Sequence, residues 1–278
     1  ARYRLSQAAV AILQGGLPAQ GVLGYKAYTS NRSGNRFLVH LLDAASGQLR
    51  AVIEADYLGM IRTGAASGVA AKWLARPDAT VAGVFGAGWQ AEGHVRAICA
   101  ARPLERVKVF SRKADKLQAF CQRMSEATGV AVVPAASSEE TVRGSDIVGT
   151  VTTAAQPLFD AEWLEPGTHI NAAGSNALIR QELSEAAVRR CDLVTVDAVP
   201  TALAEAGDLL PLLEKGRLHA RQLIELGEVI VGRHGGRTDA GQITLFESQG
   251  MAIQDLAVAL RVVQLAEERG LGSELPFQ

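Results

Sequence analysis

The sequence predicts an α/β protein: a Rossmann-type doubly wound parallel sheet plus a smaller mixed α+β domain. Two observations lead to this prediction. Between Thr80 and about Ser248, short apolar runs alternate with helical patterns, which is typical of a parallel sheet with helices on both faces. Residues 1 to about 60 instead show strand-like runs separated by glycine-bearing connections, a pattern that favours an antiparallel or mixed sheet.

The N-terminal segment combines several strand patterns with a helix. We expect strands at residues 21–29, 37–43 and 48–54, a hairpin between the last two, a loop at 15–18 and a turn at 29–35. Residues 56–74 form a helix, because Leu58, Ile61, Ala65, Val69 and Trp73 recur on one face. Pro77 ends that helix.

The rest of the chain alternates strands and helices. Strands are expected at residues 80–85, 106–110, 130–133, 147–150, 169–172, 193–196 and 243–247, with the clearest early helices at 113–128 and 138–144. Residues 223–231 are expected to be short helix or loop. A last helix runs from Met251 to about Arg269, with Ile253, Leu256 and Leu260 on its apolar face.

Composition excludes several classes of protein. The chain has 278 residues, 48% of them hydrophobic, which is enough for one large or two smaller domains. Its net charge is −1, without a basic tail or stripe, so we expect no nucleic-acid partner. No apolar stretch is long enough for a membrane span. Three scattered cysteines favour a reducing, cytoplasmic location and no metal site. The chain begins in strand-like sequence without a Met, so we expect that a native N-terminal segment is missing.

A glycine turn follows the first buried strand. Gly86 permits a sharp turn, Gly88 lets the backbone approach a pyrophosphate, and Ala91 permits close packing of helix on sheet. The helix that follows points free N–H groups at the pyrophosphate. Glycines also close ordinary turns, but the strand before and the helix after favour a dinucleotide site. The residues expected to contact the cofactor here are Gly86, Ala87, Gly88, Trp89 and Gln90.

The second strand of this unit ends in Ser111, Arg112 and Lys113. An NAD site usually has an acidic residue here to accept the ribose hydroxyls. A hydroxyl and two cations suit a 2′-phosphate instead, so the sequence slightly favours NADP over NAD. The alternative is that Arg112 stacks on adenine and Lys113 is a solvated helix residue.

Two further stretches follow strands whose carboxyl ends border the ligand crevice of such a sheet. Small and hydroxyl side chains at these positions suit a nicotinamide ribose, although each stretch alone is equally compatible with ordinary turns. The expected cofactor contacts are Thr150, Val151 and Thr152 in the first stretch and Ala173, Gly174 and Ser175 in the second, with Asn176 at its end.

Three cations lie outside the nucleotide unit. Arg2, Lys26 and Arg62 are each, taken alone, more typical of surface charges. Lys26 interrupts a glycine-rich strand, and Arg62 lies among alanines on a packed helix, where a buried cation needs an anionic partner. A substrate carboxylate would be such a partner, bound in bidentate fashion. The histidines show no triad or metal spacing, and no serine-hydrolase elbow is present.

Together these residues resemble the ornithine cyclodeaminase/mu-crystallin family over nearly the whole chain. The motifs that carry the resemblance are Arg2-Tyr-Arg-Leu5, Gly24-Tyr-Lys26, Leu41-Leu-Asp-Ala-Ala-Ser-Gly47, Ile61-Arg-Thr-Gly-Ala-Ala-Ser67, Gly86-Ala-Gly-Trp-Gln-Ala91, Asn171-Ala-Ala-Gly-Ser-Asn176 with Glu182-Leu183, and Phe246-Glu-Ser-Gln-Gly-Met-Ala-Ile-Gln-Asp255.

The resemblance implies a homodimer of two-domain subunits. Residues 1–74, completed by the helix at 251–278, would form the substrate and dimerisation domain, and residues 75–250 the dinucleotide-binding domain. It also implies that Arg2, Lys26 and Arg62 surround the substrate carboxylate and amine, and that Ser248 and Gly250 border the cofactor.

Two residues depart from the family pattern. Ornithine cyclodeaminases have a catalytic aspartate at the position of Asn176, and an amide cannot act as a general base. We still expect Asn176 to bind the substrate, because its side chain can orient an imine or a water molecule. Gln249 replaces a commonly aliphatic residue. We therefore expect an NAD(P)-dependent amino-acid dehydrogenase or ketimine reductase acting on a small 2-imino or 2-oxo acid, with Lys26 as the catalytic residue. The alternatives are an ornithine/lysine-type cyclodeaminase, which recycles its NAD, and a non-catalytic NADP-dependent binding protein of the mu-crystallin type.

Overall fold

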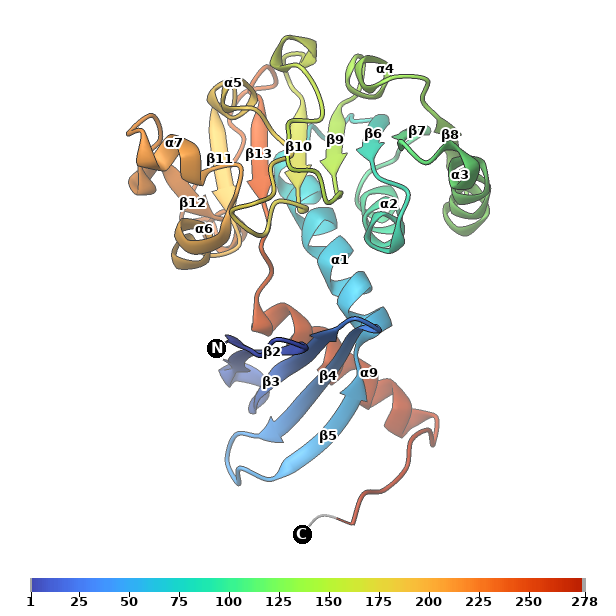
Figure 1. Ribbon diagram of the computed structural model, residues 1–278, viewed down its shortest axis with the longest axis vertical. Coiled ribbons are helices and arrows are strands. Elements are labelled where there is room, and N and C mark those ends of the chain that lie inside the picture. Colours follow the sequence, from blue (N-terminus) through green and yellow to red (C-terminus); the bar gives the residue numbers. More distant parts are fainter. Residues whose placement is uncertain (1, 277–278) are drawn as a thin grey trace. The chain divides into compact units, whose positions relative to one another are not determined.

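The computed structural model describes residues 2–276, apart from the side chains of Arg2, Arg4 and Ala114. The chain divides into two compact units (Figure 1). Unit 1 comprises Ala1–Arg62 and Gly250–Gln278, and unit 2 comprises Thr63–Gln249. The helix α1 (Asp56–Leu74) begins in unit 1 and continues into unit 2. The boundary between the two units therefore falls inside α1, after Arg62. The boundary expected from the sequence was at the end of this helix, after residue 74.

Unit 1 is an antiparallel sheet of five strands in the order β1-β2-β3-β4-β5. The strands are β1 (Arg2–Arg4), β2 (Ala8–Leu17), β3 (Val22–Asn31), β4 (Gly34–Asp43) and β5 (Leu49–Glu54), with the short 3-10 helix η1 (Pro18–Gln20) between β2 and β3. The helix α9 (Ala252–Glu268) lies along one face of this sheet (Figure 1). Val39, Leu41, Leu256 and Leu260 are buried between helix and sheet.

The prediction of a loop at residues 15–18 is wrong, because β2 continues through Gly15 and Gly16 to Leu17. Glycine serves close packing here. A Cβ atom at Gly15 would lie 3.2 Å from the Cβ atom of Ala252 on α9, so the missing side chain lets the helix approach the strand. The predicted turn at 29–35 is also shorter in the structure, since β3 ends at Asn31 and β4 begins at Gly34.

The other face of the small sheet, which we call the open sheet face, is partly exposed and apolar. Because side chains alternate along a strand, Val10, Ile12, Leu23 and Leu38 project from this face, each 37–40% exposed. Tyr25 stacks on His40 across two strands of the same face, with ring centroids 4.5 Å apart.

Unit 2 is a parallel sheet of eight strands with helices on both faces, and the predicted fold class is confirmed. The strand order is β12-β11-β13-β10-β9-β6-β7-β8. The strands are β6 (Val81–Phe85), β7 (Arg106–Phe110), β8 (Ala131–Pro134), β9 (Ile147–Thr150), β10 (His169–Ala172), β11 (Leu193–Val196), β12 (Leu223–Glu225) and β13 (Thr244–Glu247). The helices are α2 (Trp89–Ala101), α3 (Ala114–Thr128), α4 (Ser138–Val142), α5 (Glu185–Arg189), α6 (Val199–Glu205), α7 (Leu210–Glu214) and α8 (Leu226–Ile230), with 3-10 turns η2 (Ala161–Trp163) and η3 (Ala220–Gln222).

Each face of this sheet has its own core, because neighbouring residues of a strand point to opposite sides. Val84 packs with α2 and α3, while the adjacent Phe85 packs in the core that contains α5 and α6 residues. The strand order reverses between β6 and β9: the chain proceeds outward through β7 and β8, and then returns to β9 on the other side of β6. The carboxyl ends of the strands at such a reversal form the ligand crevice of doubly wound sheets.

Residues 223–231 contain one element more than the sequence suggested. Leu223–Glu225 forms the edge strand β12, paired in parallel with β11, and α8 follows directly. Three residues are too short for a recognisable strand pattern, so only the pairing with β11 reveals the strand.

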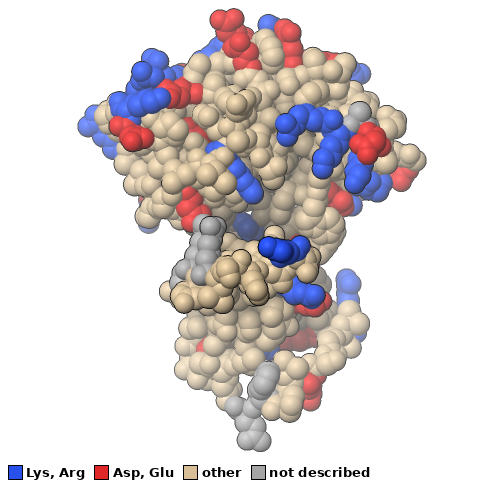
Figure 2. Space-filling view, viewed as in Figure 1, with Lys and Arg blue, Asp and Glu red and all other residues tan. Residues whose placement is uncertain are grey.

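Charged side chains of both signs are interspersed over the face of the molecule drawn in Figure 2. This agrees with the near balance of 28 basic and 29 acidic residues. Within the described part of the chain, no helix combines the length and apolar character needed to cross a membrane.

Candidate functional site

The glycine turn joins β6 to α2 in the predicted context. Gly86 has a φ of +116°, a conformation that favours glycine, and a Cβ atom there would lie 2.9 Å from the carbonyl oxygen of Val151. The Gly86 amide donates to the carbonyl oxygen of Phe110 at the end of β7. The turn is therefore held between the neighbouring strands, and a larger residue at position 86 would disturb it.

Gly88 caps α2 and borders open space. Its backbone is extended, and a Cβ atom there would meet no atom within 4 Å. Ala87 precedes it, and Trp89 and Gln90 begin the helix, with the Trp89 side chain 53% exposed. The positive end of a helix of 13 residues thus opens toward space that an anionic ligand could occupy.

Ser111, Arg112 and Lys113 follow β7, the strand that pairs with β6. Ser111 is half-buried and its Oγ accepts a hydrogen bond from the Lys113 amide at 3.3 Å. Arg112 and Lys113 are exposed. Two cations and a hydroxyl therefore lie where the second strand of a dinucleotide unit meets the adenosine ribose.

The loops after β9 and β10 are tied together by Glu182. Thr152 donates from both its backbone amide and its Oγ1 to Glu182 Oε1, each at 2.6 Å, and the Gly174 amide donates to Glu182 Oε2 at 2.8 Å. The Ala173 amide also donates to the carbonyl oxygen of Thr150. The structure thus brings both predicted stretches together. Glu182 lies in the family motif Glu182-Leu183 but was not among the predicted site residues.

Carboxyl groups gather below these loops, at the ends of β10, β11 and β13. Ser175 Oγ donates to Glu247 Oε1 at 2.5 Å, and Ser248 Oγ donates to Asp197 Oδ2 at 2.9 Å. Asp208 Oδ1 accepts from the Glu182 amide at 2.7 Å. We call Glu182, Asp208 and Glu247 the carboxyl cluster. All three are fully buried.

Burial sets the protonation of the carboxyl cluster. It raises the pKa of Glu182 to about 7 and that of Asp208 to about 6, and it raises the pKa of Glu247 well above its usual value, helped by the negative charge of Asp208. Gln249 donates from Nε2 to Glu247 Oε1 at 3.2 Å, which accounts for a polar residue at this position. Among the described residues, no group of His, Cys, Asp and Glu is arranged to hold a metal ion.

Asn176 lies in the loop after β10 and is exposed. Arg180 donates from an Nη to Asn176 Oδ1 at 3.1 Å. A guanidinium has no acceptor, so the amide oxygen of Asn176 must face it and the NH2 group must point elsewhere. Asn176 therefore offers a hydrogen-bond donor to its surroundings.

In unit 1, Lys26 and Arg62 share one buried carboxylate. Lys26 Nζ lies 2.8 Å from Asp255 Oδ2, and Arg62 Nε lies 2.9 Å from Asp255 Oδ1. Arg62 also donates to Gln254 Oε1 at 3.0 Å. We call Lys26, Arg62 and Asp255 the cation cluster. Lys26 is 4% exposed, Asp255 is inaccessible and the Arg62 side chain is 12% exposed, so the shared contact is largely shielded from water.

The cation cluster contains one more positive than negative charge. Burial lowers the pKa of Lys26, and the neighbouring Arg62 lowers it further, whereas Asp255 opposes the shift. Gly250 lies against the Arg62 guanidinium, with no space for a side chain. The Arg2 side chain lies outside the described residues. Asp255 was quoted within a family motif but not predicted as a site residue.

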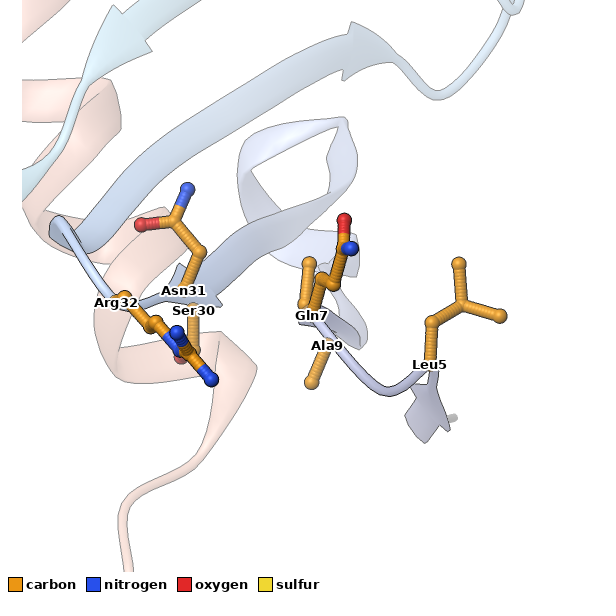
Figure 3. A pocket seen from close by; sticks show the side chains of 7 residues that line it. Leu5, Gln7, Ala9, Ser30, Asn31 and Arg32 are labelled. Atoms are coloured by element: carbon orange, nitrogen blue, oxygen red, sulfur yellow. The ribbon is translucent and has the colours of Figure 1, made fainter.

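A shallow hollow lies at one end of the small sheet (Figure 3). It has a volume of about 370 Å³ and is lined by Leu5, Gln7, Ala8, Ala9, Ser30, Asn31 and Arg32. Asn31 is the last residue of β3, whereas Lys26 lies in the middle of that strand. The hollow contains none of the predicted site residues.

Comparison with known proteins identifies similar chains. The model of the ornithine cyclodeaminase/mu-crystallin family matches residues 22–270. A Δ1-pyrroline-2-carboxylate reductase of Bacillus cereus is 39% identical over 241 residues, which are 86% of this chain and 74% of the relative.

Two solved structures are similar throughout. The Δ1-pyrroline-2-carboxylate reductase of Thermococcus litoralis, in complex with NADH and L-proline, has a TM-score of 0.93 and 30% identity, covering 99% of this chain and 88% of that one. An archaeal alanine dehydrogenase dimer with bound NAD has a TM-score of 0.92 and 30% identity, covering 100% of this chain and 87% of that one.

Proposed function

Because this chain belongs to the ornithine cyclodeaminase/mu-crystallin family, we propose that it is a nicotinamide-dependent oxidoreductase that interconverts a small 2-imino or 2-oxo acid and an L-amino acid. The observation that carries this proposal is the cation cluster. Two buried cations share a single carboxylate, and a substrate carboxylate would neutralise the remaining charge. The similar proteins named as reductases and as an alanine dehydrogenase support the same reaction class.

A nicotinamide dinucleotide is the cofactor, as it is in the two similar structures. The open space beside Gly88 and the N-terminus of α2 fit its pyrophosphate. The proposed contacts along the crevice are Gly86, Ala87, Gly88, Trp89 and Gln90 at the turn, Thr150, Val151 and Thr152 after β9, and Ala173, Gly174 and Ser175 after β10, with Ser248 and Gly250 at its border. When bound, the cofactor supplies or accepts the hydride.

Lys26 would hold and move the proton that accompanies hydride transfer. Its lowered pKa makes the ammonium a better acid than that of an exposed lysine. Asp255 keeps Lys26 Nζ in place through contacts of 2.8 and 3.0 Å. Arg62, together with Arg2, would bind the substrate carboxylate and so present one face of the reacting carbon.

The orientation of Asn176 favours the reductase over the cyclodeaminase alternative. A cyclodeaminase of this family uses an aspartate at this position as a base. In this chain the amide oxygen accepts from Arg180, and neither the amide nor the guanidinium can take up a proton at neutral pH. Asn176 can instead donate a hydrogen bond to a substrate or cofactor oxygen.

Isotope transfer tests the proposed reaction. The protein is incubated with cofactor deuterated at C4 of the dihydronicotinamide and with cyclic imines, or with 2-oxo acids plus ammonia or methylamine. We expect deuterium in the released amino acid, with one cofactor oxidised for each product. Release of ammonia from ornithine or lysine, with a cyclic amino acid as product and no net cofactor turnover, would instead identify a cyclodeaminase. Cofactor binding without either reaction would identify a binding protein.

We further propose a preference for NADP, because Arg112 and Lys113 stand where an acidic residue would favour NAD. A charge-assisted contact with a 2′-phosphate is worth about tenfold to hundredfold in affinity. Arg112→Ala should remove that advantage, while Arg123→Ala, farther along α3, should not. A wild type that prefers NADH and responds to neither substitution contradicts this assignment.

The open sheet face supports a homodimer. Four partly exposed apolar side chains share this face, and two of them, Ile12 and Leu38, both lie opposite Ala27 on neighbouring strands. Apolar patches on a small domain are typical of association surfaces. Leu38→Glu should shift the chain toward monomer in light-scattering measurements, whereas Val231→Glu, a substitution of an exposed residue in unit 2, should not. A wild type that is monomeric at micromolar concentration refutes the proposal.

A cytoplasmic location remains the expected one. The three cysteines, Cys99, Cys121 and Cys191, are free thiols, and burial raises the pKa of the Cys99 and Cys121 thiols to about 11. Unpaired, unreactive thiols suit a reducing compartment. Fractionation of the native host would test this location.

A further inference from the structure

We propose that Glu182 is a positioning residue of the cofactor site, whose carboxylate holds the loops after β9 and β10 in the geometry that binds the dinucleotide. This inference rests on the proposed function, because it takes these loops as part of the cofactor site.

Each carboxyl oxygen of Glu182 accepts hydrogen bonds from a different loop. Oε1 accepts two hydrogen bonds from Thr152, and Oε2 accepts one from the Gly174 amide. The side chain is inaccessible to solvent, so water cannot replace these contacts. Two loops that leave adjacent parallel strands are thereby joined through one side chain.

The contact continues to the glycine turn. Thr152 directly follows Val151, whose carbonyl oxygen lies where a Cβ atom of Gly86 would approach it to 2.9 Å. The Val151 amide donates to the carbonyl oxygen of Phe85 at 3.1 Å. The position of Thr152 therefore constrains the turn that would hold the pyrophosphate.

Position 174 is a glycine because of the same carboxylate. A Cβ atom there would overlap Glu182 Oε2 and the carbonyl oxygen of Thr152. The absence of a side chain at Gly174 lets its amide reach the carboxylate. The glycine and Glu182 therefore depend on each other.

The backbone of Glu182 is itself held on two sides. Its amide and that of Leu183 donate to Asp208 Oδ1 at 2.7 and 3.0 Å. Its carbonyl oxygen accepts from the Leu158 amide at 2.9 Å. Leu158 belongs to the connection after β9, and Glu182 itself lies between β10 and α5. The bonds to Asp208, between α6 and α7, therefore anchor Glu182 to a segment outside the two loops that its side chain joins.

An amide cannot replace this carboxylate. In glutamine one of the two terminal atoms is an NH2 group, which would face a backbone N–H of Thr152 or of Gly174. One buried donor would then lose its acceptor. Leaving a buried donor without its acceptor corresponds to roughly tenfold to hundredfold in an equilibrium constant. We expect NADH affinity to fall by about tenfold, because the two loops can partly readjust.

Isothermal titration calorimetry of NADH and NADPH with wild type and Glu182→Gln tests the inference. The expected result is a dissociation constant raised about tenfold at unchanged stoichiometry. A purely structural role would lower the folded fraction, and hence the stoichiometry, while leaving the dissociation constant of the folded molecules unaltered. Glu185→Gln is the matched control, because Glu185 forms surface ion pairs with Lys215 and Arg217 and should bind the cofactor like wild type.

A second pair of variants covers the case in which Glu182→Gln does not fold. Thr152→Val removes one bond to Glu182 Oε1, and Thr152→Ser retains it. Weakened binding in the valine variant and recovery in the serine variant support the inference. Wild-type affinity in Glu182→Gln, or in both Thr152 variants, overturns it while leaving the proposed function intact. Failure of the wild type to bind either dinucleotide would instead overturn the proposed function.

Discussion

In unit 1 the buried charges have partners of opposite sign. Lys26 and Arg62 each contact Asp255 within 3 Å. In unit 2, Glu182, Asp208 and Glu247 are fully buried, but within the described residues no Lys or Arg forms an ion pair with them. Their hydrogen bonds come from backbone amides and from neutral side chains. Ion pairs therefore stabilise the buried charges of unit 1, whereas hydrogen bonds from neutral groups stabilise the buried carboxyls of unit 2.

The difference shows what each cluster can do. The cation cluster contains two basic side chains and one carboxylate, and this excess of one positive charge suits the capture of an anion. Burial raises the pKa of all three members of the carboxyl cluster, and repulsion from Asp208 adds to the shift for Glu182 and Glu247, so the cluster does not ionise fully at neutral pH. Its members hold loops in place while contributing less than their full formal charge. The cation cluster is suited to binding an anionic ligand, and the carboxyl cluster is suited to holding backbone segments in place.

The largest effect is expected from removing the ammonium of the cation cluster. Lys26→Met should lower kcat by about a hundredfold to ten-thousandfold, the range of general acid–base catalysis, while cofactor affinity stays near that of wild type. Steady-state kinetics at saturating cofactor and calorimetry would measure the two quantities. Activity retained within a few-fold would remove Lys26 from the proton-transfer role and weaken the distinction between the clusters.

Removing the shared carboxylate tests whether pairing stabilises the cation cluster. Asp255→Asn leaves Lys26 and Arg62 buried without a counter-ion, and breaking such a pair costs about 3–5 kcal/mol in the free energy of unfolding. Urea denaturation would measure this loss. Glu267→Gln, on the same helix, breaks only an exposed contact with Arg50 and should change stability by less than about 1 kcal/mol.

The matching substitution in the carboxyl cluster should have the smallest effect. Glu247→Gln keeps the oxygen that accepts from Ser175 and Gln249, and it replaces Oε2, which accepts no hydrogen bond from the described residues. At pH 8 we expect unchanged or slightly higher stability, by about 1 kcal/mol, because a like charge is removed. A loss as large as that of Asp255→Asn would show that both clusters depend on ionised carboxylates.

The pH dependence of the free energy of unfolding tests whether the carboxyl cluster is protonated in the folded protein. A carboxyl whose pKa is raised by folding keeps its proton while the unfolded chain has already lost it, so stability falls as pH rises between the two pKa values. For Glu182 this window runs from 4.5 to about 7, and for Asp208 from 3.8 to about 6. Urea denaturation between pH 5 and pH 8 should therefore show a fall for wild type and a shallower one for Glu247→Gln.

The parallel sheet could be predicted closely from the sequence. The strands Ile147–Thr150, His169–Ala172 and Leu193–Val196 match their predicted bounds. Strands buried on both faces are short runs of mostly apolar residues, although β10 also buries His169 and Asn171. The same local signals located the glycine turn. The paired glycines of β2 were mistaken for a loop, because the helix that packs against them is more than 200 residues away in the chain.

The partners within the sites were less predictable. Lys26 and Arg62 stood out as cations in apolar surroundings, but the carboxylate that they share is 229 residues from Lys26. An aspartate in the first turn of an apolar helix, directly before Leu256, looks like a favourable N-terminal charge. Only the burial of Asp255 identifies it as an ion-pair partner. The role of Glu182 was equally hard to predict, because most of the groups that donate hydrogen bonds to its side chain are backbone amides. No pattern of side chains in the sequence reveals such donors.

The place of Trp89 has a spectroscopic consequence. This indole is half-exposed, directly after the glycine that borders the open space at the head of α2, and the chain contains only three tryptophans. The emission of an indole overlaps the absorption of a dihydronicotinamide, so a reduced dinucleotide bound at the turn would quench Trp89 by energy transfer and emit in its place. With the dinucleotide bound as proposed, Trp89 would be an optical reporter of cofactor occupancy, and Trp89→Phe would weaken that signal.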